Sequence, residues 1–186
     1  MQRRTVTGPI DKGIALVRSI ADQLNQHMFR SFSGRVPLRG DITFEIARAD
    51  GTHEVRRMRN LIMDAGEDEA AKLLIGLAAS PFDYIAVGTD NDPAPDDEQT
   101  ALNAESTTNG GGRAQDESPE TSGNVATVAV TFNFTGALAL VEVGLFNDTH
   151  ENGGDMFSRQ IFDVINVKDG DAMTVTWSIT VGVSRA

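Results

Sequence analysis

The chain has 186 residues, no cysteine and a formal net charge of −11 at pH 7. This length suffices for one domain with a hydrophobic core, or for a domain with an appendage. The lack of cysteine excludes disulfides, thiolate metal sites and a cysteine nucleophile. No run of about 18 apolar residues indicates a transmembrane helix, and the basic N-terminus lacks the apolar stretch of a secretory signal.

The charge is unevenly distributed along the chain. Residues 1–60 contain 11 Lys and Arg against 6 Asp and Glu, a net of +5, whereas residues 61–186 contain 5 against 21, a net of −16. This asymmetry favours a basic N-terminal arm, residues 1–60, and an acidic body, residues 61–186, with different partners. Alternatively, the arm only neutralises its own body. The acidic body would repel phosphates, so no nucleic-acid partner is expected.

The choice among charged residues is also biased. Arg outnumbers Lys 13 to 3, and Asp outnumbers Glu 17 to 10. An acidic surface poor in lysine stays hydrated at high salt, where charge repulsion is screened. A halophilic source is one hypothesis, and a GC-rich genome explains the arginine bias equally well.

Residues 9–32 are predicted to form a helix, with Pro9 in its first turn. Apolar residues recur at alternating steps of four and three, which is a heptad stripe. The stripe consists of Ile10, Ile14, Val17, Ala21, Leu24 and Met28. It covers a helix packed on its own sheet or forms a short bundle with copies of the chain, although it is too short to hold an oligomer alone.

A β-hairpin is expected next. Ile42, Phe44 and Ile46 alternate with polar residues, Asp50–Gly51 indicates a two-residue turn, and residues 52–60 return as the second strand. Four arginines cluster here, without the interleaved aromatic residues of a single-strand nucleic-acid surface. We interpret them as a solvated or protein-facing basic edge: Arg48, Arg56, Arg57 and Arg59.

A second helix is predicted over residues 65–79. Asp64 and Glu67 have the spacing of an N-cap and capping box, and Pro81 ends the helix. The predicted apolar face is formed by Ala70, Leu73, Leu74 and Leu77. The following apolar run, residues 82–89, indicates a buried strand.

Residues 89–123 are rich in Asp, Asn, Gly, Ser, Thr and Pro. Such a segment cannot bury enough apolar surface to order itself, so we expect a long exposed loop, anchored at Leu102 and ordered only by a neighbour. Its acidic stretch has oxygen ligands suited to Ca²⁺ in Asp90, Asp92, Asp96, Asp97 and Glu98. Pro95 and Ala101 occupy the positions where an EF-hand needs Gly and Glu, so a solvated acidic loop is the preferred interpretation and no metal is expected.

From residue 124 onward the pattern is that of β-structure. Apolar residues alternate with polar ones, for example Val128, Val130 and Phe132, and turn signals separate the strands. The expected fold is mainly β with two helices in the N-terminal half (α+β), built on an antiparallel β-sandwich. Trp177 is the expected centre of its core.

Little in the chain indicates catalysis. The three histidines, His27, His53 and His150, do not have metal-ligand spacing. No local signature of a nucleophile such as G-x-S-x-G is present. We therefore expect neither enzymatic activity nor a cofactor.

Four segments of the body resemble a family of small virion proteins of tailed phages and archaeal tailed viruses. They are PFDYIAVGT, the V-G-L-F-N strand end, S-R-Q-x-F and the G-D-x-x-T-V-T-W ending, within residues 61–186. The acidic loop is longer than is usual for that family, and residues 1–60 do not share the resemblance. The resemblance implies a virion structural component of the tail or fibre type, with no defined activity.

The leading hypothesis is accordingly a non-enzymatic virion protein of the tail, neck or baseplate. The arm would dock on other virion proteins through the Ile10–Met28 stripe and the arginines of the hairpin, and the chain would form a homo-oligomer. Decoration of the capsid surface is an alternative. A host-glycan-binding adhesion module is another, although the chain has only one Tyr and one Trp for stacking on sugars. No membrane partner is expected.

Overall fold

The computed structural model describes residues 37–77, 80–151 and 153–182. The chain divides into two compact units, Met1–Val36 and Pro37–Ala186. The described residues belong to the second unit, so the helix predicted over residues 9–32 lies outside them.

The described unit is mainly β, with two five-stranded antiparallel sheets and one described helix, α2 (Asp64–Leu74). The first sheet has the order β2-β1-β10-β7-β6, and the second has the order β3-β9-β8-β4-β5. The strands of the first sheet are β1 (Leu38–Ala47), β2 (His53–Arg59), β6 (Glu120–Ser122), β7 (Val125–Asn133) and β10 (Ala172–Val181). Those of the second sheet are β3 (Leu61–Ile62), β4 (Tyr84–Gly88), β5 (Ala114–Gln115), β8 (Leu138–Phe146) and β9 (Met156–Val167).

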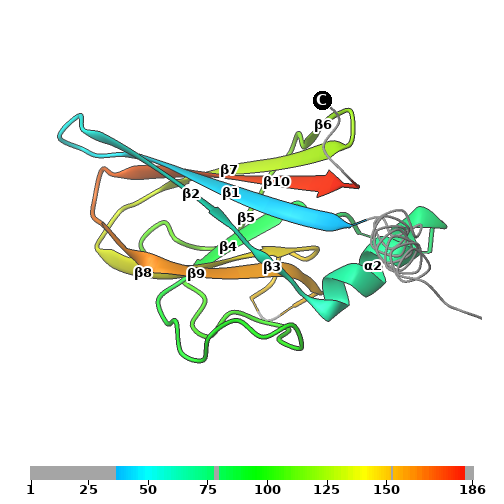
Figure 1. Ribbon diagram of the computed structural model, residues 1–186. Helices are drawn as coiled ribbons and strands as arrows, with labels where there is room; N and C mark the ends of the chain where they lie inside the picture. The colour runs from blue at the N-terminus through cyan, green and yellow to red at the C-terminus, as the bar shows by residue number, and fades with distance from the viewer. Residues whose placement is uncertain (1–36, 78–79, 152, 183–186) are drawn as a thin grey trace, which may run out of the picture. The chain divides into compact units, whose positions relative to one another are not determined.

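The predicted hairpin is part of the body rather than of an arm. Strand β1 pairs along its whole length with β10, from Leu38 opposite Val181 to Ala47 opposite Ala172. The first and last described strands are therefore neighbours in the middle of one sheet (Figure 1). A boundary after residue 60 does not fit this pairing, and the division falls between Val36 and Pro37.

The turn of this hairpin is longer than the predicted two residues. Ala47 pairs with His53, so residues 48–52 form the connection. The N–H of Arg48 donates to the carbonyl of Thr52 at 2.8 Å. Gly51 has a φ of +85°, a conformation that favours glycine.

The two sheets face each other across a shared hydrophobic core (Figure 1). Phe44 of β1 contacts Phe162 of β9, with ring centroids 4.8 Å apart. The predicted alternation is confirmed, since Ile42, Phe44 and Ile46 are almost fully buried. Trp177 is 0% exposed and lies in this core, as expected.

The second sheet is apolar on both faces. A smaller cluster on its outer side contains Met63, Ala86, Leu102, Phe146 and Met156. This cluster explains why β8 is buried almost without interruption, because a strand covered on two sides does not alternate. The segment after β4 supplies part of this cover through Leu102.

Helix α2 differs at both ends from the prediction. Asp64 is its first residue and not its N-cap; the N-cap is Met63, which makes no side-chain cap hydrogen bond. The N–H of Asp64 instead donates to the carbonyl of Asp97 at 2.9 Å, so the acidic loop satisfies this helix end. The helix ends at Leu74, five residues before the predicted end, and Gly76 follows with a φ of +71°.

Candidate assembly surface

The predicted contact residues fall into two groups. The apolar stripe lies outside the described residues: Ile10, Ile14, Val17, Leu24 and Met28. The four arginines of the hairpin are described, but they do not form one surface. Successive side chains of a strand point to opposite faces, and Arg56 is half-buried whereas Arg57 and Arg59 are exposed.

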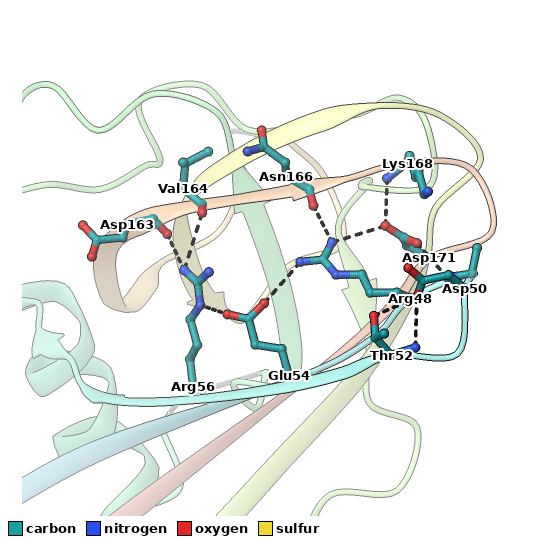
Figure 2. A network of polar contacts seen from close by, with 11 residues as sticks. Arg48, Asp50, Thr52, Glu54, Arg56, Asp163, Val164, Asn166, Lys168 and Asp171 are labelled. Atoms are coloured by element: carbon teal, nitrogen blue, oxygen red, sulfur yellow. Dashed lines mark hydrogen bonds and ion pairs between the residues drawn. The ribbon is translucent and has the colours of Figure 1, made fainter.

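Arg48 and Arg56 are engaged within the body (Figure 2). The carboxylate of Glu54 lies between them, with Oε2 3.3 Å from Nη2 of Arg48 and Oε1 2.5 Å from Nε of Arg56. Arg56 also donates to the carbonyl of Asp163 at 2.8 Å. Arg48 donates to the carbonyl of Asn166. Both arginines therefore link the hairpin to β9 in the other sheet.

Asp171 completes this network on the other side of Arg48. Its buried carboxylate accepts the N–H of Ala49 at 2.9 Å and that of Lys168 at 3.1 Å, and Oδ2 lies 3.2 Å from Nη1 of Arg48. The pKa of Asp171 is lowered, mainly by the hydrogen bond from Ala49 and further by those from Arg48 and Lys168. Donors of this kind stabilise the ionised carboxylate.

The arginines that remain at the surface lie on the opposite face of the hairpin. The side chain of Arg59 is 75% exposed, with Nε 4.0 Å from Oδ1 of Asp41. Arg39 of β1, which sequence reasoning missed, donates to the same oxygen at 2.8 Å. Its odd position in β1, matching Asp41 and Glu45, was the available signal. The exposed basic set of the hairpin is thus Arg39, Arg57 and Arg59.

The acidic segment is held by the body itself, through a buried ion pair. Glu142 of β8 and Arg159 of β9 are both 0% exposed, with Oε2 2.8 Å from Nη2. The Glu142 carboxylate also accepts the backbone N–H groups of Asn103 and Ala104, at 3.0 and 2.8 Å. Arg159 donates to Oε1 of Gln99 at 2.8 Å. One ion pair therefore fixes the loop on the outer side of the second sheet.

A second buried pair lies within the loop. Arg113 makes two parallel hydrogen bonds with Glu105, at 2.9 and 2.7 Å. Its third nitrogen donates to the carbonyls of Asp148 and Gly153, and the guanidinium lies 3.8 Å from the ring centroid of Phe146. This two-pronged geometry is specific to arginine.

The expectation that residues 89–123 need a neighbour to become ordered does not describe the structure, because strands of the same chain supply the partners. The predicted anchor, Leu102, is confirmed at 6% exposure. The missed signal was Arg113, a lone arginine in an acidic segment. Composition counts it as one charge, although it makes four hydrogen bonds.

The carboxylates considered for Ca²⁺ do not converge. Within the described ranges, no group of three or more His, Asp or Glu residues is arranged to hold a metal ion. Oδ1 of Asp90 and Oδ1 of Asp96 accept backbone N–H groups of Asp92 and Glu98 instead. His150 lies beside Asp148, with Nδ1 2.8 Å from Oδ1, and lowers the pKa of that carboxyl. His53 begins β2, and His27 is outside the described residues.

The most unusual surface lies at the C-terminal end of α2. Of the predicted apolar face, only Ala70 packs against the core. Large apolar side chains nearby are exposed: Leu73 at 43%, Leu74 at 87%, Ile75 at 71% and Leu77 at 71%. We call these four residues the α2 apolar patch. Its exposure is a consequence of tertiary packing, because α2 contacts β9 through Gly66, where an added methyl would lie 2.4 Å from the carbonyl oxygen of Phe157.

An apolar groove of about 320 Å³ adjoins the patch. Leu73 and Ala70 of α2 line one part of it, and Leu38, Phe82 and Phe157 line other parts. Asp83 also lines the groove and is 6% exposed. Its Oδ2 accepts a hydrogen bond from Gln115 at 2.9 Å. Its Oδ1 has no hydrogen-bond partner in the described part of the chain.

No protein-family model matches the chain, and no match is found among curated proteins or solved structures. None of the described helices is long and apolar enough to span a membrane.

Proposed function

We propose that this chain is a non-enzymatic structural protein of a tailed-virus particle, located in the tail, neck or baseplate. The observation that carries the proposal is the α2 apolar patch together with the adjoining groove. Contiguous exposed apolar side chains of this size mark surfaces that other proteins cover. The described unit is a β-sandwich body that supplies such a surface.

The segments that resemble virion proteins form the scaffold of this body. V-G-L-F-N lies at the end of β8, S-R-Q-x-F lies on β9, and the final segment leads into β10. Within them, Phe146 and Arg159 hold the acidic loop in place. Residues typical of the resemblance thus maintain shape, which suits a protein that acts by fitting against others.

The docking arm in this proposal is residues 1–36, extended by the exposed arginines of the hairpin. Residues 1–36 contain 6 Lys and Arg against 2 Asp, a net charge of +4. Arg57 and Arg59 add positive charge on the body itself. Other virion proteins with acidic surfaces are the partners, and repeated weak contacts in a homo-oligomer add up to firm attachment.

The test is whether the protein is a component of purified particles. Particles from a culture of the source are banded on a density gradient, and the chain is located by immunoblotting and immunogold electron microscopy. We expect labelling at the tail, neck or baseplate. Labelling over the capsid would favour the decoration alternative, and absence from the particles would contradict the proposal.

The adhesion alternative gains no support from the aromatic residues. Trp177 is fully buried, and Tyr84 is half-buried on β4. A platform for stacking on sugars requires exposed rings. A glycan array on the purified chain separates this alternative, since a purely structural protein gives no binding.

A further inference from the structure

The groove beside α2 combines apolar walls with one unsatisfied carboxylate oxygen. Its walls include Leu38, Ala70, Leu73, Phe82 and Phe157. Oδ1 of Asp83 is buried without a partner among the described residues, which is costly for a carboxylate. An occupant that fits both features has a row of apolar side chains and one cationic or N–H donor beside it.

The chain itself contains a segment with this chemistry. The stripe of residues 10–28 presents apolar side chains at helical spacing, and Arg18 stands next to Val17 and four residues after Ile14. On a helix, residues at this spacing are neighbours along one side. Arg18 would therefore border the stripe near its middle.

The charges are also complementary. The rim of the groove formed by α2 is acidic, because the helix carries Asp64, Glu67, Asp68 and Glu69 against the single Lys72. Residues 1–36 have a net charge of +4. Opposite charges of this kind align an apolar segment and increase its rate of association.

We infer that the groove binds the Ile10–Met28 segment of a second copy of this chain, with Arg18 donating to Asp83. The inference rests on the proposed function, in which copies must join one another on a particle. Each copy has one groove and one segment, so the contact is heterologous and repeats from copy to copy. Such contacts close into a ring or extend as a filament.

Cysteine cross-linking tests the contact directly, because the natural chain has no cysteine. Full-length Val17→Cys protein is mixed with full-length Leu73→Cys protein under mild oxidation. Val55→Cys is the matched control, since Val55 is 51% exposed, Leu73 is 43% exposed, and Val55 does not line the groove. We expect disulfide heterodimers with Leu73→Cys to form about a hundredfold faster than with Val55→Cys, as an effective concentration in the millimolar range requires.

Two outcomes would overturn the inference. Equal cross-linking of the two partners would show that the segment does not enter the groove. A Val17→Cys, Leu73→Cys double variant that closes a disulfide within a monomer, without heterodimers in the mixture, would show that the segment comes from the same chain. Either result leaves the particle-labelling experiment unaffected, so failure of this contact and failure of the proposed function are distinguishable.

Light scattering on full-length variants tests the roles of individual side chains. Leu73→Asp is expected to weaken self-association at least about tenfold, as loss of a central apolar contact does, whereas Leu74→Asp, which is outside the groove, is expected to have little effect. Asp83→Asn and Arg18→Gln should each weaken it, and the double variant should be no weaker than either one. Additive effects of these two substitutions would refute the Arg18–Asp83 contact, and equal effects of the two leucine variants would refute the groove.

Discussion

The second sheet and the hairpin both use arginine–carboxylate pairs to hold distant segments together, but they do so in different surroundings. At the second sheet, Arg159 and Glu142 are 0% exposed. At the hairpin, the side chains of Arg48, Glu54 and Arg56 are 21%, 38% and 29% exposed. The same chemical pairing therefore occurs once without water and once within reach of it.

The comparison shows that burial decides what an ion pair contributes. In the buried pair, loss of one partner leaves an uncompensated charge that water cannot solvate. At the hairpin, water and salt replace much of the lost interaction. The loop held by Arg159 should consequently depend on its ion pair far more strongly than the hairpin does.

The largest effect is expected for Arg159→Ala. It leaves the Glu142 carboxylate buried without its counter-charge and removes the donor to Gln99. The free energy of unfolding should fall by about 3–5 kcal/mol, measured by urea denaturation. Arg57→Ala on the exposed face serves as the control and should lie within about 0.5 kcal/mol of wild type. A loss below about 1 kcal/mol for Arg159→Ala would undermine the comparison.

Substitution of Arg113 comes next. Arg113→Ala removes both hydrogen bonds to Glu105 and the contact with Phe146, and should cost about 3 kcal/mol. Arg113→Lys keeps the charge but not the two-pronged geometry, so it should recover only part of this loss. Urea denaturation gives both values, and limited proteolysis of residues 89–113 reports whether the loop detaches. Full recovery by lysine would show that charge alone matters here.

Asp171→Asn tests the hairpin network through its pH dependence. The pKa of Asp171 in the folded chain is lowered, below an unfolded value near 3.9. Its stabilising contribution is therefore present above pH 4 and is lost as the pH falls through the folded pKa. We expect Asp171→Asn to be less stable than wild type by about 1–2 kcal/mol at pH 6.

Unfolding curves between pH 6 and pH 3 check this prediction. The gap between wild type and Asp171→Asn should narrow toward pH 3, as the wild-type carboxylate becomes protonated. A constant gap over this range would show that the hydrogen-bonding geometry, rather than the ionised carboxylate, provides the stability.

The smallest effect is expected for Arg39→Ala. Arg39 is 52% exposed and pairs with Asp41 on the surface. Such pairs contribute at most about 1 kcal/mol and less in salt, so the loss should be about 0.5 kcal/mol or less at low salt and vanish in 1 M NaCl. Thermal unfolding at the two salt concentrations measures it. A larger, salt-independent loss would mean that exposure does not separate the two kinds of pair.

Much of the fold was predictable from local sequence. The alternation of Ile42, Phe44 and Ile46 predicted a strand with one buried face, and Leu102 was recognised as the anchor of its loop. The site was less predictable. The arginines of the hairpin were treated as one surface, whereas Arg48 and Arg56 are engaged within the body. The apolar side chains of the second helix were expected to pack, yet Leu74 is 87% exposed.

The sequence by itself determined where strands run and which side chains they bury, because side-chain direction in a strand follows a period of two residues. Only the tertiary structure decided which charges meet. Glu142 and Arg159 are 17 residues apart, and the loop residue Gln99 is 60 residues from Arg159. Whether such groups pair depends on how two strands and a loop come together in space. The same holds for the α2 apolar patch, because the close approach at Gly66 turns these side chains away from the core.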